Sequence, residues 1–293
     1  MIGALREDTS FEAERSRLVG LAYRITGSRA EADDIVQDAW LRWQRADPTT
    51  VARPAAWLTT VTSRLSLDRL KSAHHQRETY VGPWLPEAAN PEPGPAEHAE
   101  LAESLTIGFL AVLERLGPVE RVVFLLADVF GLPFDEIAGV VHKTPEACRQ
   151  VASRARHRVR EERPRYAPTD EEAWQVTAAF LEAAQAGDLE TLVSLLAPDA
   201  LAISDGGPDH HAGRRPVVAE RIPRFVANLT RKGIRPTDVL LPRLINGQPG
   251  VVIEREGTPA FAVALSVTNG KVDRIWAIVN PNKLQTLDSN PIA

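Results

Sequence analysis

Residues 132–165 read LPFDEIAGVVHKTPEACRQVASRARHRVREERPR, and this stretch decides the fold around it. It predicts two helices joined by a short turn at His142-Lys143. Pro133 marks the first helix start, where the missing N–H of a proline costs nothing. Thr144 offers a side-chain oxygen as an N-cap, and Pro145 suits the first position of the second helix.

The second of these helices has one packed face and one polar, basic face. At helical spacing the packed face comprises Cys148, Val151, Ala152, Ala155 and Val159. The opposite face comprises Glu146, Gln150, Ser153, Arg154 and His157, flanked by Arg149 and Arg160. This pattern is typical of a helix-turn-helix whose second helix enters the DNA major groove.

Charge in this stretch supports the DNA-binding interpretation. Between Lys143 and Arg165, eight Lys or Arg stand against three acids, whereas the whole chain has a net charge of −5. Phosphates favour such a concentration of positive charge through counterion release. The alternative is a solvated amphipathic helix with an ordinary run of charge.

Composition limits the class of protein. A chain of 293 residues has room for about two or three domains. The single cysteine, Cys148, excludes an internal disulfide and a cysteine-rich zinc site, and the seven histidines show no metal spacing. We therefore predict no metal and no cofactor. No apolar run is long enough to span a bilayer and MIGALREDTSFEAER is no signal peptide, so we expect a cytoplasmic protein without a membrane partner.

Three helices are predicted before residue 80. The first covers residues 10–26, ends at Gly27 and packs through Phe11, Leu18, Leu21, Ala22 and Ile25. Ser28 and Glu31 form a capping box for the second, whose packed stripe is Ile35, Val36, Ala39 and Trp43 and whose exposed stripe is acidic. Pro54 opens the third, which packs through Leu58, Val61 and Leu65 and carries a basic cluster of Arg64, Arg69, Lys71 and Arg77.

Residues 80–97 form a linker, because five prolines and two glycines exclude regular structure. Tyr80, Trp84 and Leu85 are apolar side chains that a solvated linker does not need. We infer that Trp84-Leu85 docks on another part of the chain.

Beyond Pro168 the pattern changes from helices to strands. Two helices with a corner at Gly187-Asp188 precede a strand (ALAISDGG), a further helix and three β-rich runs. Asn246-Gly247 and Asn269-Gly270 are strong hairpin signals. Helices followed by a curved antiparallel sheet indicate an α+β domain.

Residues 10–165 resemble the extracytoplasmic-function sigma factors of bacterial RNA polymerase. The resemblance rests on the acidic helix with DDIVQDAW, the basic helix with WLTTVTSRLSLDRLK, the linker and the helix-turn-helix, in that order. It implies a sigma-2 domain at residues 1–79, a linker at 80–98, a sigma-4 domain at 99–167 and a further domain at 168–293. The last resembles a SnoaL-like cone of the nuclear-transport-factor-two superfamily.

Sigma factors with such an extension carry three motifs, WLPEP, DGGGK and NPDKL. Here the corresponding residues are Trp84-Leu85-Pro86-Glu87-Ala88, Asp205-Gly206-Gly207-Pro208-Asp209 and Asn280-Pro281-Asn282-Lys283-Leu284. Ala88 replaces a proline, which is a mild change. Pro208 and Asp209 replace a glycine and a lysine, which removes a flexible, basic turn.

The resemblance implies roles for particular residues. Contact with the β′ clamp helices of core RNA polymerase falls to Asp33, Asp34, Gln37, Asp38 and Leu41. The resemblance also implies a contact with the β flap of the polymerase, to which no particular residues are assigned. The −10 promoter element falls to Arg64, Asp68, Arg69 and Lys71. The −35 element falls to Lys143, Thr144, Glu146, Arg149, Gln150, Ser153, Arg154, Arg156 and His157. Interdomain regulation falls to Trp84, Leu85, Pro86, Glu87, Asp205, Gly206, Gly207, Asn280, Pro281 and Lys283.

We therefore predict an alternative sigma factor whose C-terminal domain modulates its activity in cis, with no separate anti-sigma factor required. An unidentified small ligand in the cone fits this prediction. One alternative is an enzyme, for which Asp199, Asp205, Asp209, His210 and His211 offer acid–base groups without an evident partner. Another is a one-component helix-turn-helix repressor with a ligand-sensing cone, which would have no use for the acidic second helix.

Overall fold

The computed structural model describes residues 9–47, 51–77, 80, 82–89, 106–162, 170–207 and 215–287. The chain divides into two compact units. The first unit comprises residues 1–78, 92–104 and 112–162, and the second comprises residues 79–91, 105–111 and 163–293. The domain boundaries expected at residues 98/99 and 167/168 lie outside the described residues. In the described part of the chain no helix is long and apolar enough to cross a membrane.

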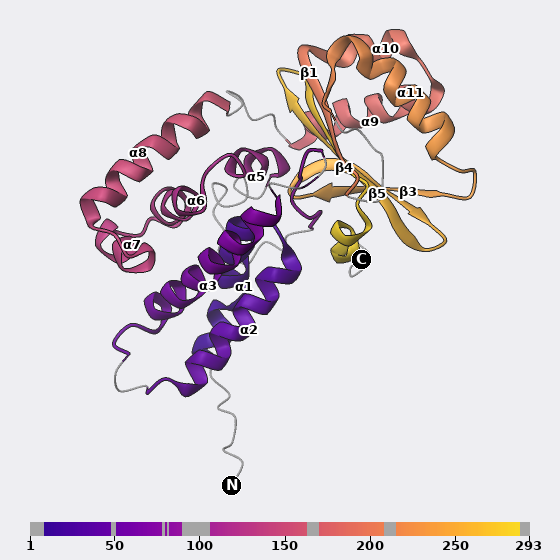
Figure 1. Ribbon diagram of the computed structural model, residues 1–293. Helices are drawn as coiled ribbons and strands as arrows, with labels where there is room; N and C mark the ends of the chain where they lie inside the picture. Colours follow the sequence, from indigo (N-terminus) through magenta and orange to yellow (C-terminus); the bar gives the residue numbers. More distant parts are fainter. Residues whose placement is uncertain are drawn as a thin grey trace. The chain divides into compact units, whose positions relative to one another are not determined.

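The first unit begins with the three predicted helices, α1 (Thr9–Thr26), α2 (Arg29–Arg45) and α3 (Pro54–Arg77) (Figure 1). Ser28 caps α2 as expected, because its side chain accepts a hydrogen bond from the Glu31 N–H at 3.1 Å. The predicted packed residues of α1 are all buried. In α3, Leu58 and Val61 are buried but Leu65 only partly so, whereas Thr62, Ser63 and Ser66 are fully buried. The reason is that α3 packs against α1, α2, α6 and α7 on several sides.

The unit continues with α6 (Pro118–Phe124), a π-helical turn η2 (Leu125–Val129), α7 (Phe134–Val141) and α8 (Pro145–Glu162). Pro133 precedes α7 as its N-cap, and His142 ends it in the left-handed region at φ 54°. Thr144 accepts a hydrogen bond from the Ala147 N–H at 3.2 Å. The predicted packed face of α8, from Cys148 to Val159, is buried, so the helix-turn-helix has the expected form.

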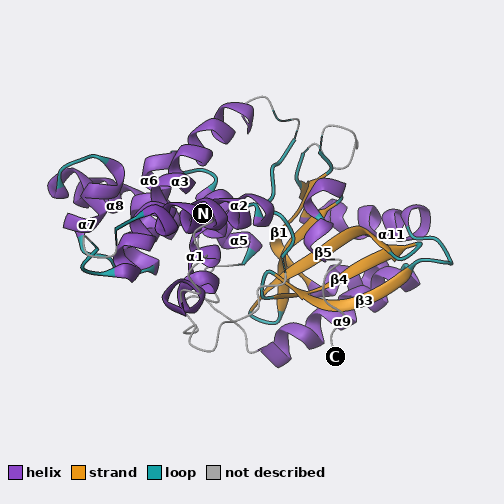
Figure 2. Cartoon of the chain, turned by 90° about the horizontal axis from the view of Figure 1, so that it is seen from below, coloured by secondary structure: helices purple, strands orange, loops and turns teal. Residues whose placement is uncertain are grey.

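The second unit contains α9 (Asp170–Ala186), α10 (Leu189–Leu195), α11 (Ile222–Gly233) and a six-stranded sheet (Figure 2). The strands are β1 (Leu196–Asp205), β2 (Val217–Val218), β3 (Val239–Ile245), β4 (Gln248–Arg255), β5 (Thr258–Thr268) and β6 (Lys271–Ile278), in the order β2-β1-β6-β5-β4-β3. The sheet is not purely antiparallel as expected, because β1 pairs with β6 in parallel. This pairing places the ends of β1 and β6 side by side.

Both predicted hairpin turns are confirmed. Asn246-Gly247 and Asn269-Gly270 have positive φ at both residues, as a type I′ turn requires. A third hairpin, between β4 and β5, turns at Glu256-Gly257 with the same two positive φ angles.

The two faces of the sheet have different covers. On one face α9, α10 and α11 bury Ala202, Leu265 and Ile275. On the other face the cover comes from the linker and from α5 (Ile107–Leu113), through Leu85, Ala88 and Ile107, together with Leu284 and Leu287 after β6. The Ile107 N–H donates to the Gln248 side chain at 3.0 Å, which fixes the start of α5 on this face. The linker is therefore part of the core of the second unit.

Candidate polymerase, promoter and interdomain sites

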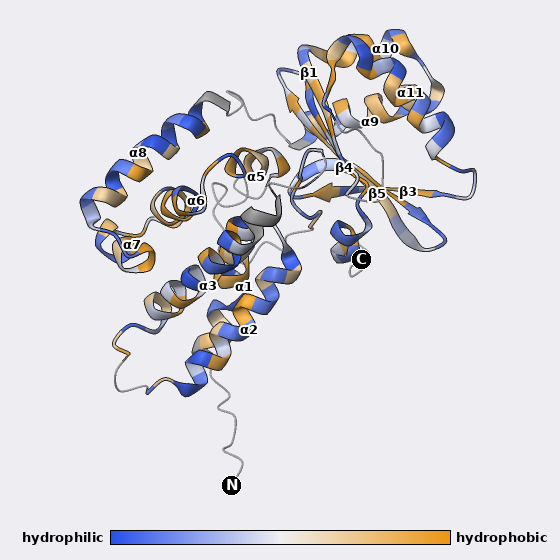
Figure 3. Ribbon diagram, viewed as in Figure 1, coloured by the Kyte–Doolittle hydropathy of each residue, from blue (hydrophilic) through white to orange (hydrophobic). Residues whose placement is uncertain are grey.

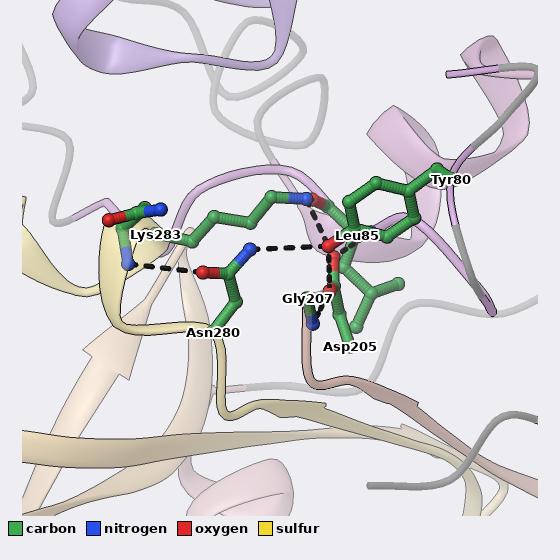
Figure 4. A network of polar contacts seen from close by, with 7 residues as sticks. Tyr80, Leu85, Asp205, Gly207, Asn280 and Lys283 are labelled. Atoms are coloured by element: carbon green, nitrogen blue, oxygen red, sulfur yellow. Dashed lines mark hydrogen bonds and ion pairs between the residues drawn. The ribbon is translucent and has the colours of Figure 1, made fainter. Parts of the chain in front are cut away.

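Within the second unit, Asp205 is the centre of a polar network that joins the linker to the ends of β1 and β6 (Figure 4). Its carboxylate is fully buried at the end of β1. It accepts hydrogen bonds from the Tyr80 hydroxyl (2.5 Å), the Leu85 N–H (2.8 Å) and the Gly207 N–H (3.0 Å). It also forms an ion pair with Lys283 at 2.6 Å. A buried carboxylate needs such compensation, because an unpaired charge in the interior is strongly unfavourable.

The Lys283 ammonium is held from several sides. Besides Asp205, it donates to the Leu85 carbonyl at 2.5 Å. It lies 3.9 Å from the centre of the Trp84 ring and 5.2 Å from that of Tyr80, within range of cation–π attraction. Lys283 itself is only 7% exposed, so these contacts replace its water.

Asn280 completes the network. Its Nδ2 donates to the Tyr80 hydroxyl at 3.2 Å, and its Oδ1 accepts from the Asn282 N–H at 3.1 Å. Burial, followed by the hydrogen bond to Asp205, raises the pKa of the Tyr80 phenol. The phenol therefore stays protonated near neutral pH and can donate to the Asp205 carboxylate.

Hydrogen bonds from the backbone N–H and C=O groups of the linker hold its remaining residues in place. The Ala88 N–H donates to the Lys283 carbonyl at 3.0 Å. The Asn246 N–H donates to the Ala89 carbonyl at 2.7 Å, and the Asn246 side-chain Oδ1 accepts from the Ala89 N–H at 3.0 Å. Pro86 and Glu87 are buried beside them. The structure thus brings together the described residues of the three motifs. Pro208 and Asp209 of the second motif lie outside the described residues, as do the acid–base candidates His210 and His211.

Gly207 is required by this geometry. Its φ is +69°, and a Cβ at this position would lie 2.8 Å from the Asn280 side chain. We expect Gly207→Ala to lower the free energy of unfolding by about 1–2 kcal/mol or more, through backbone strain and this close contact. Urea denaturation measures it. Gly187→Ala is the control, because its φ of +70° gives similar strain while its Cβ meets no atom within 4 Å. Equal losses in both variants would show that contact with Asn280 is unimportant.

The predicted −35 residues of α8 lie on its exposed side. Glu146, Arg149, Gln150, Ser153, Arg154 and His157 are exposed, as are Lys143 and Thr144 in the turn. Figure 3 shows hydrophilic residues recurring along α8. Arg156 is different, because its guanidinium donates to Asp128 at 2.8 Å and is only partly exposed. Arg158 and Arg154 lie 2.6 and 4.0 Å from the Glu120 carboxylate of α6. These contacts hold the two arginine side chains toward α6.

The predicted polymerase residues of α2 form a solvent-facing stripe. Asp33, Asp34, Gln37 and Asp38 precede Leu41, an apolar side chain that is 44% exposed. Asp33 forms an ion pair with Arg29 at 3.2 Å. An acidic stripe with one exposed leucine can meet a basic protein surface with a small apolar contact.

The predicted −10 residues lie on α3, where one of them is engaged within the first unit. Arg64 donates to the Gly139 carbonyl of α7 at 2.8 Å, whereas Asp68, Arg69 and Lys71 are exposed. Arg53 and Glu136 form a second bridge to α7 at 2.9 Å.

Deeper in the same unit, Arg121 of α6 is 1% exposed and donates to the Arg24 carbonyl of α1 at 3.3 Å. Sequence patterns gave no sign of these contacts.

None of the described residues forms a group of three or more His, Cys, Asp or Glu that could hold a metal ion. Of the acid–base candidates, Asp205 is used for the linker network. Asp199 is exposed and accepts a hydrogen bond from Arg274 through its backbone carbonyl.

Comparisons with known proteins agree with the geometry. Residues 11–76 match the Sigma-70 region 2 family and residues 108–159 match the Sigma-70 region 4 family. The chain is 41% identical to the ECF RNA polymerase sigma factor SigJ of Mycobacterium tuberculosis, covering 94% of this chain and 93% of that protein. It is 36% identical to the probable ECF sigma factor SigI of the same species, covering 95% and 94%.

A solved structure extends the match to three dimensions. The crystal structure of Mycobacterium tuberculosis SigJ has a TM-score of 0.75 and 38% identity, covering 95% of this chain and 98% of that one. The predicted fold class, two helical sigma domains followed by an α+β domain, is therefore confirmed. Sigma factors bind core RNA polymerase and promoter DNA, and the family is not enzymatic. The chain belongs to the extracytoplasmic-function sigma factors, and it is an alternative sigma factor that directs RNA polymerase in transcription initiation.

Proposed function

We propose that the docked linker allows the C-terminal domain, residues 168–293, to modulate this sigma factor in cis. The observation that supports the proposal is the buried Asp205 carboxylate, which binds the linker at Leu85 and the C-terminal segment at Lys283. The linker connects the helices that precede it to those that follow it. Anchoring it on the C-terminal domain therefore restricts the movement that these helices have relative to one another.

Because the linker and its docking site belong to the same chain, a weak contact between them is sufficient for regulation. A docking site on the same chain acts at a high effective concentration, so docked and undocked states can be balanced without great affinity. Because the control element is part of the chain, the proposal requires no separate anti-sigma factor. It also places the protein in the cytoplasm, with the polymerase.

The residue roles are proposed on the geometry of each helix. The acidic stripe of α2 suits basic residues of the β′ clamp helices, where opposite charges set rate and register more than affinity. The exposed side of α8 offers Gln150, Ser153 and Arg154 to the −35 base edges, with Arg149 at the phosphates. On α3, Arg64 donates one N–H to Gly139, and its remaining guanidinium N–H groups are proposed to contact a −10 phosphate.

Trp84→Ala tests modulation in cis. Removing the ring from Lys283 should lower the free energy of docking by about 1–2 kcal/mol, a factor of about 5–30 in the ratio of docked to undocked chain. Run-off transcription with core RNA polymerase, on the chain's own upstream region, should change accordingly, and the direction of the change gives the sign of control.

Trp174→Ala is the matched control, because it removes a partly buried tryptophan from α9, a helix that covers the face of the sheet opposite the linker. Its run-off yield should equal that of the unaltered chain. The same yield from Trp84→Ala would contradict modulation through the linker. Point variants are preferable to a chain that ends near Pro168, because that truncation would expose Leu85 and Ile107, which the sheet buries.

A further inference from the structure

One helix of the C-terminal domain carries a row of basic side chains that the roles assigned above do not use. Arg221 occupies the N-cap position of α11 without a side-chain capping bond, and Arg224, Arg231 and Lys232 follow within the helix. With Asn228 they form the group that we call the α11 stripe. At 3.6 residues per turn these five positions fall within a sector about 100° wide. All five are exposed.

The opposite side of α11 explains why the stripe faces solvent. Ile222 is fully buried, and Val226 packs with it against the cluster formed by α9, α10 and the sheet. A helix anchored by these two residues has no freedom to turn its basic side inward. Figure 3 shows hydrophilic residues toward the end of this helix.

The cations of the stripe are not neutralised within the described part of the chain. No carboxylate of the described residues forms an ion pair with them, and the polar contact of Arg231 is with Asn228 at 3.0 Å. The arginines of α8 differ in this respect, because Arg156 and Arg158 are paired with acids. From Arg215 to Arg235, six basic residues stand against one acid, Glu220, in a chain of net charge −5.

The chemistry of the stripe favours phosphate over a protein surface. Arginine presents a planar fork of donors that matches phosphate oxygens, and three of the four cations are arginines. The exposed apolar side chain of the same helix, Leu229 (49% exposed), lies outside the sector of the stripe, whereas the centre of a protein–protein interface is depleted of charge and rich in apolar side chains. From Arg221 to Lys232 the stripe extends about 16 Å along the helix axis, a length over which one DNA strand carries about five phosphates.

We propose that the α11 stripe binds the phosphate backbone of promoter duplex DNA, as a contact additional to those of the sigma-2 and sigma-4 domains. Such a contact carries no sequence information. It adds affinity and salt dependence to every sequence and helps to fix the position of the C-terminal domain on DNA.

The test uses the full chain assembled with core RNA polymerase and a duplex fragment of its own upstream region. Arg221→Gln, Arg224→Gln and Arg231→Gln are combined in one variant, and DNA binding is measured by fluorescence anisotropy over a range of salt concentrations. We expect the slope of log affinity against log salt to become shallower by about 2–3, because each phosphate contact contributes about 0.9. The loss should be the same on an unrelated duplex of equal length.

A second triple variant, Arg15→Gln, Arg115→Gln and Lys271→Gln, removes the same charge from exposed positions outside the stripe. It should leave the slope unchanged. If both triple variants change the slope equally, the effect is one of net charge and the proposal fails. If the stripe variant instead weakens assembly with core polymerase, the stripe binds protein. If it changes neither quantity, the stripe is a solvated helix face.

Discussion

Asp205→Ala should release the linker and destabilise the protein by about 3–5 kcal/mol, the cost of leaving one member of a buried ion pair without its partner. The variant removes the acceptor for Tyr80, Leu85 and Gly207 as well as the partner of Lys283. Chemical denaturation measures the total loss. Amide hydrogen exchange locates it, because Leu85 donates its N–H directly to the Asp205 carboxylate.

Exchange should accelerate at Leu85, Ala88 and Ala89 while the amides of β4 and β5 stay protected. That pattern would mean that the linker detaches from the sheet while the sheet remains folded. Acceleration over the whole sheet would instead show that docking is inseparable from folding of the second unit, and protection retained at Leu85 would contradict the network. Asp199→Ala is the control, since this exposed aspartate lies on the same strand.

A double-mutant cycle isolates the ion pair. Asp205→Asn keeps the shape of the side chain but leaves the Lys283 charge buried, and Lys283→Met leaves the Asp205 charge buried. The double variant removes both charges and should be more stable than the sum of the two single losses predicts, because neither charge is then stranded. Strict additivity would mean that the two groups do not interact.

Local sequence patterns predicted the helices of the first unit well. In α8 the apolar positions recur every 3.6 residues, and a single buried face is enough to place Cys148, Val151 and Ala155 in the core. The face of α3 was predicted less well, because helices pack on several of its sides and no single stripe describes it. The turn at Glu256-Gly257 escaped notice because glutamate, unlike asparagine, is not a usual residue at positive φ.

Long-range contacts could not be predicted from local patterns. Parallel pairing of β1 with β6 depends on the order of strands across the sheet. The linker follows neither a helical nor a strand period, so its burial leaves no trace beyond the unexplained Trp84 and Leu85. The network brings together Tyr80, Asp205 and Lys283, although more than half of the chain separates the first from the last. Their amino-acid types alone do not indicate that they are partners. Their regulatory role was suggested only through the motifs of the family.

Arg154→Ala should weaken binding of the holoenzyme to its promoter by about 1–3 kcal/mol, or about 5- to 150-fold, if Arg154 contacts a base edge. The side chain is 59% exposed, and its nearest acid, Glu120, lies 4.0 Å away, so its guanidinium is available to DNA. The measurement is affinity for the promoter and for a set of promoters with single substitutions in the −35 element. At one −35 position, a base substitution should lower the affinity of the unaltered protein but leave the affinity of the Arg154→Ala variant nearly unchanged.

Arg158→Ala provides the comparison for Arg154, because it removes the same charge from the same helix. Arg158 lies one turn after Arg154 and forms the closer ion pair with the same Glu120, at 2.6 Å instead of 4.0 Å, so its guanidinium is less available to DNA. Losing this half-exposed ion pair should change stability and promoter affinity only slightly. If Arg154→Ala weakens binding equally on every −35 sequence, Arg154 contacts a phosphate and the base is read by another residue, of which Gln150 and Ser153 are the nearest candidates on the same exposed face. If the two variants behave alike, Arg154 is not a base-reading residue.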